Sequence, residues 1–335
     1  MNSILISKMA SKEQIESAAQ IIKSGGLVAF PTETVYGLGA DALNSNAVAK
    51  IFIEKERPSF DPLIVHICDI KDIERLTKQY DSRVDILSKM FWPGPLTIVL
   101  PKSDIVPDIV TSGLSTVGIR MPKNKIALDF IKACGCPIAA PSANKFGRIS
   151  PTAATHVKKQ LTGVECVLDG GPCEVGIEST VISLNPDGFV ILREGYITCA
   201  NLQKALPKSK EKKYNSPVAS PGLLESHYSP IKPLFLVDRE NITLTDIFGF
   251  KWPKGNGGFI SFSGKTLPEF TLTEYLSKDG NLKEAAINLF GILHKLEDNP
   301  AIDYIVAESV PLEGIGRAIM DKLNKAAHRY TKLTL

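Results

Sequence analysis

Residues 31–66 decide the fold of this chain, and they run PTETVYGLGADALNSNAVAKIFIEKERPSFDPLIVH. An apolar run over 27–30 stops at a proline and gives way to hydroxyl groups, one carboxylate and two glycines. A helical pattern follows and ends at Lys55 and Arg57, ahead of a second apolar run that ends at His66. Strand, polar turn, helix and strand in this order predict an α/β fold, which binds ligands where its strands end. The stretch lacks a standard phosphate loop, yet it has the hydroxyls and cations of an anion site.

Composition narrows the class of protein. The chain has 335 residues, enough for two domains, and its 44% hydrophobic and 22% charged content is that of a globular protein. A net charge of +3 is too small to predict nucleic acid as a partner by itself. The six cysteines have neither metal-site nor disulfide spacing, and Cys134 and Cys136 are expected at a helix end. No apolar stretch approaches the ~20 residues of a membrane span, so we expect a cytoplasmic protein with no membrane partner.

Helical and apolar segments alternate through the first 200 residues. Ser11 and Gln14 have capping-box spacing and start a helix that two glycines end. Further helices are expected at 46–54, 73–79, 84–91, 126–133 and 153–161, and strands at 27–30, 63–67, 96–100, 116–121, 137–140, 180–184 and 189–192. The last two strands flank Asn185-Pro-Asp-Gly188 and predict a hairpin. The fold class predicted is therefore α/β with a mixed sheet.

The amino-acid composition of the chain changes after residue 200. Clustered lysines and five prolines over 201–233 predict a linker. Beyond it, strands are expected at 234–237, 258–262 and 304–308, and helices at 282–296 and 318–330. We therefore expect a catalytic domain over 1–200, a linker or lid over 201–233 and a smaller α/β domain over 234–335.

Several residue groups suit anion chemistry, and each also has a purely structural interpretation. Lys55 and Arg57 match oxyanions, but cations also favour helix C-termini. His66 at a strand end fits either a ligand contact or a core histidine. Ser142 and Asn144 follow a strand and precede further cations, which fits an anion cradle or an ordinary turn.

Taken together, the motifs resemble a known family. FPTETVYGLGADA, KERPSFDPLIVH, WPGPLTIVL, STVGIRMP, APSAN, DGGP, GIESTVIS and ILREG, in this order, are similar to the threonylcarbamoyl-AMP synthase family with its YrdC-type fold. The likeness is close over about 18–195. SPGLLESHYSP and EGIGRAIMDKLNKAAHR resemble the longer members, which carry an extra C-terminal domain, here expected to be Rossmann-like.

The resemblance implies an activity. It implies an enzyme, a nucleotidyltransferase, that forms threonylcarbamoyl-AMP and pyrophosphate from L-threonine, bicarbonate and ATP with Mg²⁺. The product serves threonylcarbamoyladenosine modification of tRNA, so tRNA or a tRNA-modifying transferase complex is a possible partner. The implied fold is a twisted mixed sheet whose concave face holds the substrates.

The resemblance also implies roles for single residues. Lys55 and Arg57 correspond to the catalytic cations. The positions that line the threonine pocket are Thr34, His66, Arg120, Ala140 and Thr180. The positions around ATP are Arg57, Asp61, Thr116, Ser142, Asn144, Ser150, Arg193 and, in the linker, Tyr228. No metal site made of protein side chains is implied.

Asp61 departs from the family pattern, which usually has asparagine at this position. A carboxylate repels phosphate unless Mg²⁺ bridges the two or the side chain turns away. Two rival functions stay open at this stage. One is an RNA-binding module that uses a concave basic face with Lys55, Arg57, Arg120 and Arg148, and the other is a related maturation enzyme that uses carbamoyl phosphate. The second rival normally carries CxxC modules that this chain lacks.

Overall fold

The structure of this protein is a computed structural model that describes residues 10–212, 227–237 and 253–328. The chain divides into two compact units. The first contains Met1–Phe146 and Ser150–Leu223, and the second contains Gly147–Ile149 and Leu224–Leu335. Among the described residues, none of the helices combines the length and apolar character needed to span a bilayer.

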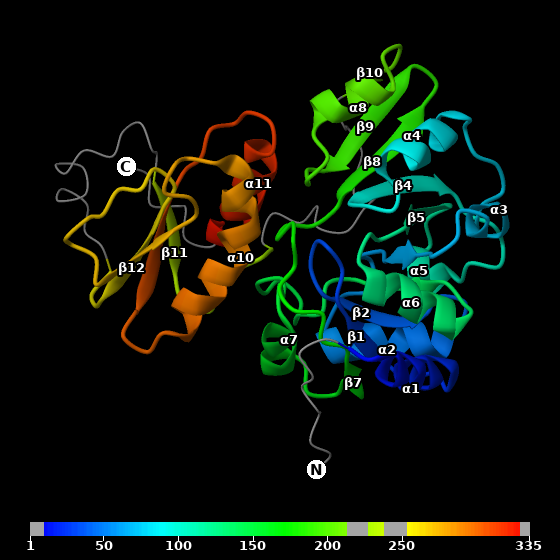
Figure 1. The fold of residues 1–335 in the computed structure, drawn as a ribbon, viewed down its shortest axis with the longest axis horizontal. Helices are drawn as coiled ribbons and strands as arrows, with labels where there is room; N and C mark the ends of the chain where they lie inside the picture. The colour runs from blue at the N-terminus through cyan, green and yellow to red at the C-terminus, as the bar shows by residue number, and fades with distance from the viewer. Residues whose placement is uncertain (1–9, 213–226, 238–252, 329–335) are drawn as a thin grey trace. The chain divides into compact units, whose positions relative to one another are not determined.

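The first unit is a mixed α/β domain. Its helices are α1 (Lys12–Lys23), α2 (Ser45–Lys55), α3 (Asp72–Leu76), α4 (Arg83–Phe91), α5 (Asp108–Thr111), α6 (Lys125–Cys134), α7 (Ala154–Gln160) and α8 (Cys199–Ala205). Its strands are β1 (Val28–Phe30), β2 (Gly37–Asp41), β3 (Ile64–His66), β4 (Leu96–Pro101), β5 (Thr116–Arg120), β6 (Ile138–Ala139), β7 (Cys166–Val167), β8 (Thr180–Asn185), β9 (Gly188–Arg193) and β10 (Lys210–Glu211). The strands form one sheet in the order β10-β9-β8-β4-β5-β3-β6-β2-β1-β7, with parallel and antiparallel neighbours (Figure 1). The predicted mixed sheet is confirmed.

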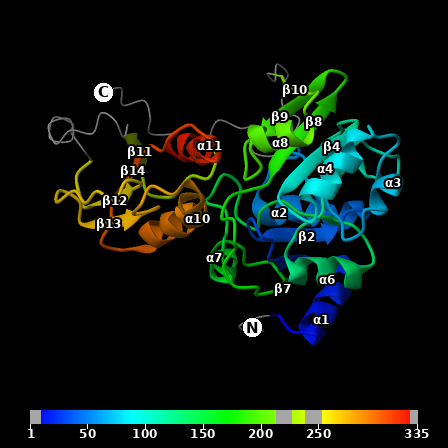
Figure 2. The ribbon, with the colours of Figure 1, turned by 45° about the horizontal axis from the view of Figure 1, so that its top comes forward.

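Both faces of the sheet are buried around β1 and β2. Val28 and Phe30 pack into one core cluster with α1 and α6, whereas Ala29 between them packs into the other with α2. This alternation follows from the two-residue period of a strand. Helices α1 and α6 contact each other on the first face, as Figure 2 also shows. The capping box that begins α1 is present, with Gln14 N donating to Ser11 Oγ at 3.3 Å.

The polar turn that the sequence predicts after β1 is shorter than expected, because a strand begins at Gly37. Residues 37–41 form β2, which pairs antiparallel with β1. A Cβ at Gly37 would come within 3.3 Å of the Phe30 ring, and one at Gly39 within 2.9 Å of it and 2.7 Å of Ile138. These glycines therefore let a buried aromatic ring pack on the hairpin, a requirement that local sequence patterns do not reveal.

The end of the first unit confirms one prediction and corrects another. Strands β8 and β9 form the predicted hairpin, in which Asn185 pairs with Gly188. The linker was expected to begin at residue 201, but α8 occupies Cys199–Ala205 and β10 adds a parallel edge strand beside β9. The expected start was wrong because clustered lysines are as compatible with a short helix and an edge strand as with a linker. Residues 213–226 of the expected linker lie outside the described residues.

The second unit is a parallel α/β domain. It contains β11 (Leu234–Val237), β12 (Gly257–Ser261), β13 (Leu272–Tyr275), α10 (Leu282–Asp298), β14 (Tyr304–Glu308) and α11 (Gly316–Ala327). The strands pair in parallel in the order β11-β14-β12-β13. This arrangement agrees with the predicted Rossmann-like fold class. Strand β13 escaped sequence analysis because all four of its residues are only half-buried and its apolar pattern is weak.

Candidate active site

Neighbouring strands bring most of the predicted threonine pocket together. Strand β3 lies between β5 and β6, and its register sets His66 beside Arg120. Ala140, directly after β6, donates its backbone N–H to the carbonyl of Ile64 on β3 at 2.9 Å. Arg120 Nη2 donates to Thr34 Oγ1 at 2.9 Å, which ties β5 to the turn after β1. Four of the five predicted positions therefore converge.

Thr180, the fifth position, lies farther along the same sheet. It pairs with Leu96 on β4, the strand next to β5. Its hydroxyl donates to the Ile197 carbonyl at 2.7 Å, and its backbone N–H donates to the Pro95 carbonyl at 3.0 Å. These bonds fix the residue at the start of β8, but no contact to the other four positions follows from them, so its role in the pocket stays a prediction.

Glu33 supplies the carboxylate of the polar turn after β1, which suits a ligand's amino group, although it is not among the predicted pocket positions. Its carboxylate lies 2.8 Å from Arg120 Nη2 and accepts the Lys123 backbone N–H at 3.0 Å. The two side chains are 3% and 5% exposed, so the ion pair is shielded from water and holds the guanidinium in place. A single carboxylate in the PTETVYG turn was the available signal. The result is a cation, a carboxylate and hydroxyls close together, which complement the charges of an amino acid.

His66 is a neutral side chain in this setting. Burial, and after it the positive charge of Arg120, lower its pKa from 6.5 to about 3. The Phe30 ring meets it edge-on at 5.9 Å between centroids, and its Nδ1 atom is buried with no hydrogen-bond partner. The imidazole therefore carries no charge near neutral pH, and its threonine contact stays a prediction.

This lowered pKa predicts acid sensitivity. Between pH 6.5 and about 3, the unfolded chain binds a proton at His66 that the folded chain does not bind. Stability therefore falls as the pH falls, by roughly 1.4 kcal/mol per pH unit from this group. From pH 7 to pH 4.5, the wild type should lose roughly 2–3 kcal/mol more unfolding free energy than His66→Gln. Urea unfolding of both proteins at the two pH values measures this, and equal losses would contradict it.

The predicted catalytic lysine is buried. Lys55 is 1% exposed, and its Nζ donates to the backbone carbonyls of Ser142, at 2.6 Å, and Asn144. Burial lowers its pKa well below the usual 10.5, and the nearby charge of Arg57 adds to this effect. An incoming anion would compensate both effects. The contacts also link the KERP motif to the PSAN motif, so the structure brings together Lys55, Ser142 and Asn144.

Asp61 turns its carboxylate toward protein. Arg57 Nη2 lies 2.9 Å from Asp61 Oδ2 and 3.0 Å from the Pro62 carbonyl, and Arg57 Nε donates to the Asp61 carbonyl at 3.1 Å. Both side chains are 3% exposed. Burial raises the pKa of Asp61, and the cations oppose that shift. The carboxylate therefore pairs with an arginine of the protein. This corresponds to the second possibility named above, in which the side chain turns away from phosphate.

Arg193, a predicted ATP position at the end of β9, is held by Ser179 just before β8. Its guanidinium donates to the Ser179 carbonyl, at 3.1 Å from Nε and 2.9 Å from Nη2, and to the Ser179 hydroxyl at 2.9 Å. Burial raises the pKa of Asp61 and lowers that of His66, and the charge of Arg193 is the smallest of the causes that lower each pKa.

Three further predicted ATP positions, Ser150, Thr116 and Tyr228, lie in different parts of the chain. Ser150 is buried and donates to Glu178 Oε1 at 2.6 Å. Thr116 starts β5, and the β3–β5 register places it near the level of Pro62, whose carbonyl binds Arg57. Tyr228 belongs to the second unit, where its ring packs on Phe290 at 5.4 Å. The predicted nucleotide contact of Tyr228 stays a prediction.

No resident metal centre is built into the described part of the chain. Its His, Cys, Asp and Glu side chains form no group of three or more suited to a metal ion. Mg²⁺ that accompanies ATP stays a prediction.

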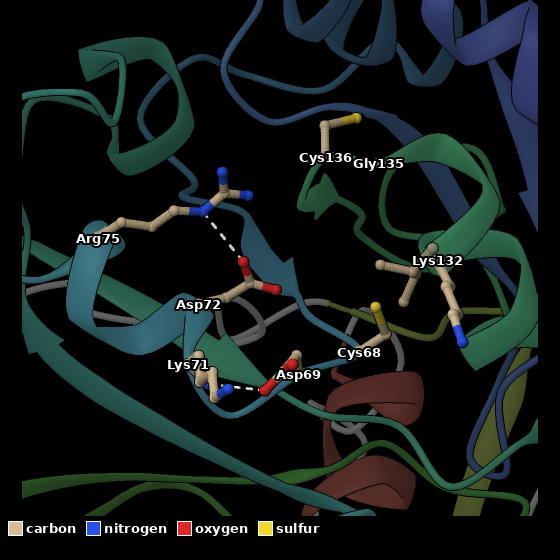
Figure 3. Close-up of a pocket in the computed structure, with 9 residues that line it drawn as sticks. Cys68, Asp69, Lys71, Asp72, Arg75, Lys132, Gly135 and Cys136 are labelled. Carbon is tan, nitrogen blue, oxygen red and sulfur yellow. Dashed lines mark hydrogen bonds and ion pairs between the residues drawn. The ribbon is translucent and has the colours of Figure 1, made fainter.

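A separate surface pocket of about 370 Å³ contains none of the predicted site residues (Figure 3). Cys68 and Cys136 line it, and burial raises the pKa of both thiols. Raised pKa values make thiols poor nucleophiles. Arg75 Nε pairs with Asp72 at 3.0 Å on the same wall. The pocket therefore offers no evident chemistry.

The rival RNA-binding function does not fit these cations. Lys55, Arg57 and Arg120 are 1%, 7% and 4% exposed, so they cannot line a groove for an RNA backbone. Arg148 forms an ion pair with Glu297 at 4.0 Å. The fold and site instead define the class of protein: an α/β enzyme with a mixed sheet and a buried, cation-rich site that suits an amino acid beside phosphates.

Comparison with known proteins identifies the family. A family described as "Telomere recombination" (Sua5_yciO_yrdC) matches residues 20–195, and one described as "Threonylcarbamoyl-AMP synthase, C-terminal domain" matches 197–328. Threonylcarbamoyl-AMP synthases of Pyrococcus abyssi and Bacillus subtilis are each 40% identical, over 94% of this chain and 94% and 93% of their own lengths. The crystal structure of Pyrococcus abyssi Sua5 complexed with L-threonine matches with a TM-score of 0.84, 39% identity and 95% coverage of both chains. The chain belongs to the threonylcarbamoyl-AMP synthase family.

Proposed function

We propose that this enzyme is an L-threonylcarbamoyladenylate synthase that joins L-threonine, bicarbonate and ATP into threonylcarbamoyl-AMP and releases pyrophosphate. Family membership and the likeness to a threonine-bound relative support this proposal. The observation that carries it is the closeness of the two groups of site residues along the chain after β6: Ala140 bonds to β3 beside His66, and Ser142, two residues on, accepts from Lys55. The reaction needs an amino acid and a triphosphate side by side. The enzyme is then a nucleotidyltransferase of the cytoplasm that serves tRNA modification.

The chemistry follows from the charges in the site. The amine of threonine adds to CO₂ derived from bicarbonate and forms a carbamate. A carbamate oxygen then attacks the α-phosphorus of ATP, the bond to the bridging oxygen breaks, and pyrophosphate leaves with that electron pair. Negative charge grows on phosphate oxygens, so positioned cations rather than a covalent nucleophile supply the catalysis.

The side chains divide this work. Arg120, held by Glu33, binds the threonine carboxylate, while Thr34 and neutral His66 supply hydrogen bonds. Lys55 and Arg57 face the triphosphate and stabilise its growing charge. Mg²⁺ enters as part of the MgATP substrate and neutralises phosphate charge when bound. The product passes to a transferase that acts on tRNA.

A pyrophosphate-release assay tests the function. Release from ATP should require both L-threonine and bicarbonate, and omission of either should reduce it to background. Release without threonine or bicarbonate would refute the proposal, and release that depends on carbamoyl phosphate would support the rival maturation enzyme. Serine should be used about 10–200-fold less efficiently than threonine, because a pocket for one methyl group discriminates by only that much. Equal efficiency for serine would contradict a shaped pocket.

A further inference from the structure

Glu178 is a buried carboxylate in a rigid part of the first unit. It precedes β8 by two residues and is 5% exposed. The backbone of Gly195 packs directly on this segment, so that a Cβ there would come 2.6 Å from the Glu178 carbonyl and 2.3 Å from the Thr180 nitrogen. The position of the side chain is therefore set by the fold and not by a mobile loop.

One oxygen of this carboxylate has a partner and the other has none. Oε1 accepts from Ser150 Oγ at 2.6 Å, whereas Oε2 is fully buried with no hydrogen-bond partner. Glu308 in the second unit shows the usual arrangement, because its Oε2 accepts from Phe262 N at 2.7 Å and its Oε1 from Ser263 Oγ at 2.8 Å. A buried carboxylate oxygen without a donor is costly. It indicates a donor that arrives with a ligand.

The surroundings restrict what that donor is. A triphosphate has no hydrogen-bond donors near neutral pH. Arg193 donates to Ser179 next to Glu178, but among the described residues no cation forms an ion pair with Glu178 itself. Among the parts of ATP, donors remain on the ribose hydroxyls and on the adenine amine.

The Ser150–Glu178 pair matches the ribose better than the base. Because Ser150 gives its hydroxyl proton to Glu178 Oε1, the carboxylate keeps Oε2 as an acceptor for donors of a ligand. The edge of adenine sets an acceptor nitrogen beside its amine and so requires a protein donor next to a protein acceptor. Two neighbouring ribose hydroxyls are both donors. An acidic residue on ribose hydroxyls is also a physical solution that dinucleotide-binding folds use.

We propose that Glu178, together with Ser150, binds the ribose hydroxyls of ATP and makes the enzyme select ribonucleotides over deoxyribonucleotides. This proposal rests on the proposed function, since it assigns a contact within the same nucleotide site.

The wild-type enzyme provides the first test. Pyrophosphate release is measured with ATP, 2′-deoxy-ATP and 3′-deoxy-ATP at fixed threonine and bicarbonate. A charge-assisted hydrogen bond predicts a kcat/KM about 10–100-fold lower for at least one deoxy nucleotide. The KM for threonine should stay unchanged. Values of kcat/KM within about twofold of each other for all three nucleotides would overturn the proposal.

The variant Glu178→Gln locates the effect. It should lower kcat/KM for ATP by about tenfold and leave the affected deoxy nucleotide nearly unchanged, so that the preference for ATP shrinks. Glu308→Gln, the same change at a fully bonded buried carboxylate, should keep the wild-type preference. Retention of the preference in Glu178→Gln, or rescue of that variant by high Mg²⁺, would overturn the proposal. Rescue would identify Glu178 as a metal contact.

Calorimetry separates this inference from the proposed function. Binding of ATP and the two deoxy nucleotides to the wild-type chain needs no turnover, and a melting curve shows whether each variant folds. An enzyme without threonine-dependent release that still binds ATP at least tenfold more tightly than a deoxy nucleotide would refute the function and support the ribose contact. Equal binding of all three would refute the contact even in an active enzyme.

Discussion

Replacement of Lys55 by alanine should lower threonine-dependent pyrophosphate release by about 10²–10³-fold, the usual cost of removing one charge-stabilising donor from an enclosed site. Lys55 is buried and held by the carbonyls of Ser142 and Asn144, so its ammonium group is placed before the substrate arrives. Growing negative charge on the phosphates meets a fixed cation there, and no water molecule can replace it at equal strength.

The position of Lys55 within α2 offers a matched control. Lys50 lies on the same helix and donates to the Gly25 carbonyl at 2.7 Å, but it is exposed. Lys50→Ala should therefore keep activity within about twofold. Near-normal release by Lys55→Ala, with an unchanged melting temperature, would remove the lysine from the mechanism.

The pH dependence gives a second readout for Lys55. A lysine is charged below its pKa, and burial lowers the pKa of Lys55 well below 10.5. As the pH rises through this lowered pKa, kcat/KM for ATP should fall, earlier than an ordinary lysine would cause. Lys55→Arg, whose guanidinium stays charged, should move this fall to higher pH.

Replacement of Glu33 by glutamine should destabilise the first unit by about 3–5 kcal/mol, because it leaves Arg120 charged and buried beside a neutral partner. The pair is separated by 2.8 Å and both side chains are at most 5% exposed. The same change should raise the KM for threonine, since Glu33 fixes the guanidinium that we propose binds the substrate carboxylate. Urea unfolding and threonine titration measure the two effects.

Two further variants serve as controls for Glu33→Gln: one at an exposed ion pair, and one that removes both charges of the buried pair. Lys125 and Asp129 on α6 are 86% and 46% exposed, so Asp129→Asn should change stability by less than about 0.5 kcal/mol. The double variant Glu33→Gln with Arg120→Met should be less destabilised than the sum of the single variants, because it removes both charges. Additive losses would mean that the two side chains do not depend on each other.

The elements that sequence analysis predicted well are those with strong local signals. The Ser11–Gln14 capping box, the β8–β9 hairpin and strand β14 all depend on periodicity or turn chemistry within a few residues. Strand β2 was missed because its glycines serve the packing of Phe30, which only the folded hairpin brings near. The start of the linker was misplaced because α8 and β10 are short and depend on neighbours for their stability.

The sequence by itself determined the family, the mixed α/β class and the set of cations and hydroxyls at the ends of strands, since motif order and spacing are local properties of the chain. Only the tertiary structure decided how these groups act on each other. Sheet order joins Thr34 to Arg120 across 86 residues, and loop packing joins Ser150 to Glu178 across 28. Burial makes His66 neutral and pairs Asp61 with Arg57. Desolvation and long-range contact arise from packing, which no stretch of sequence carries alone.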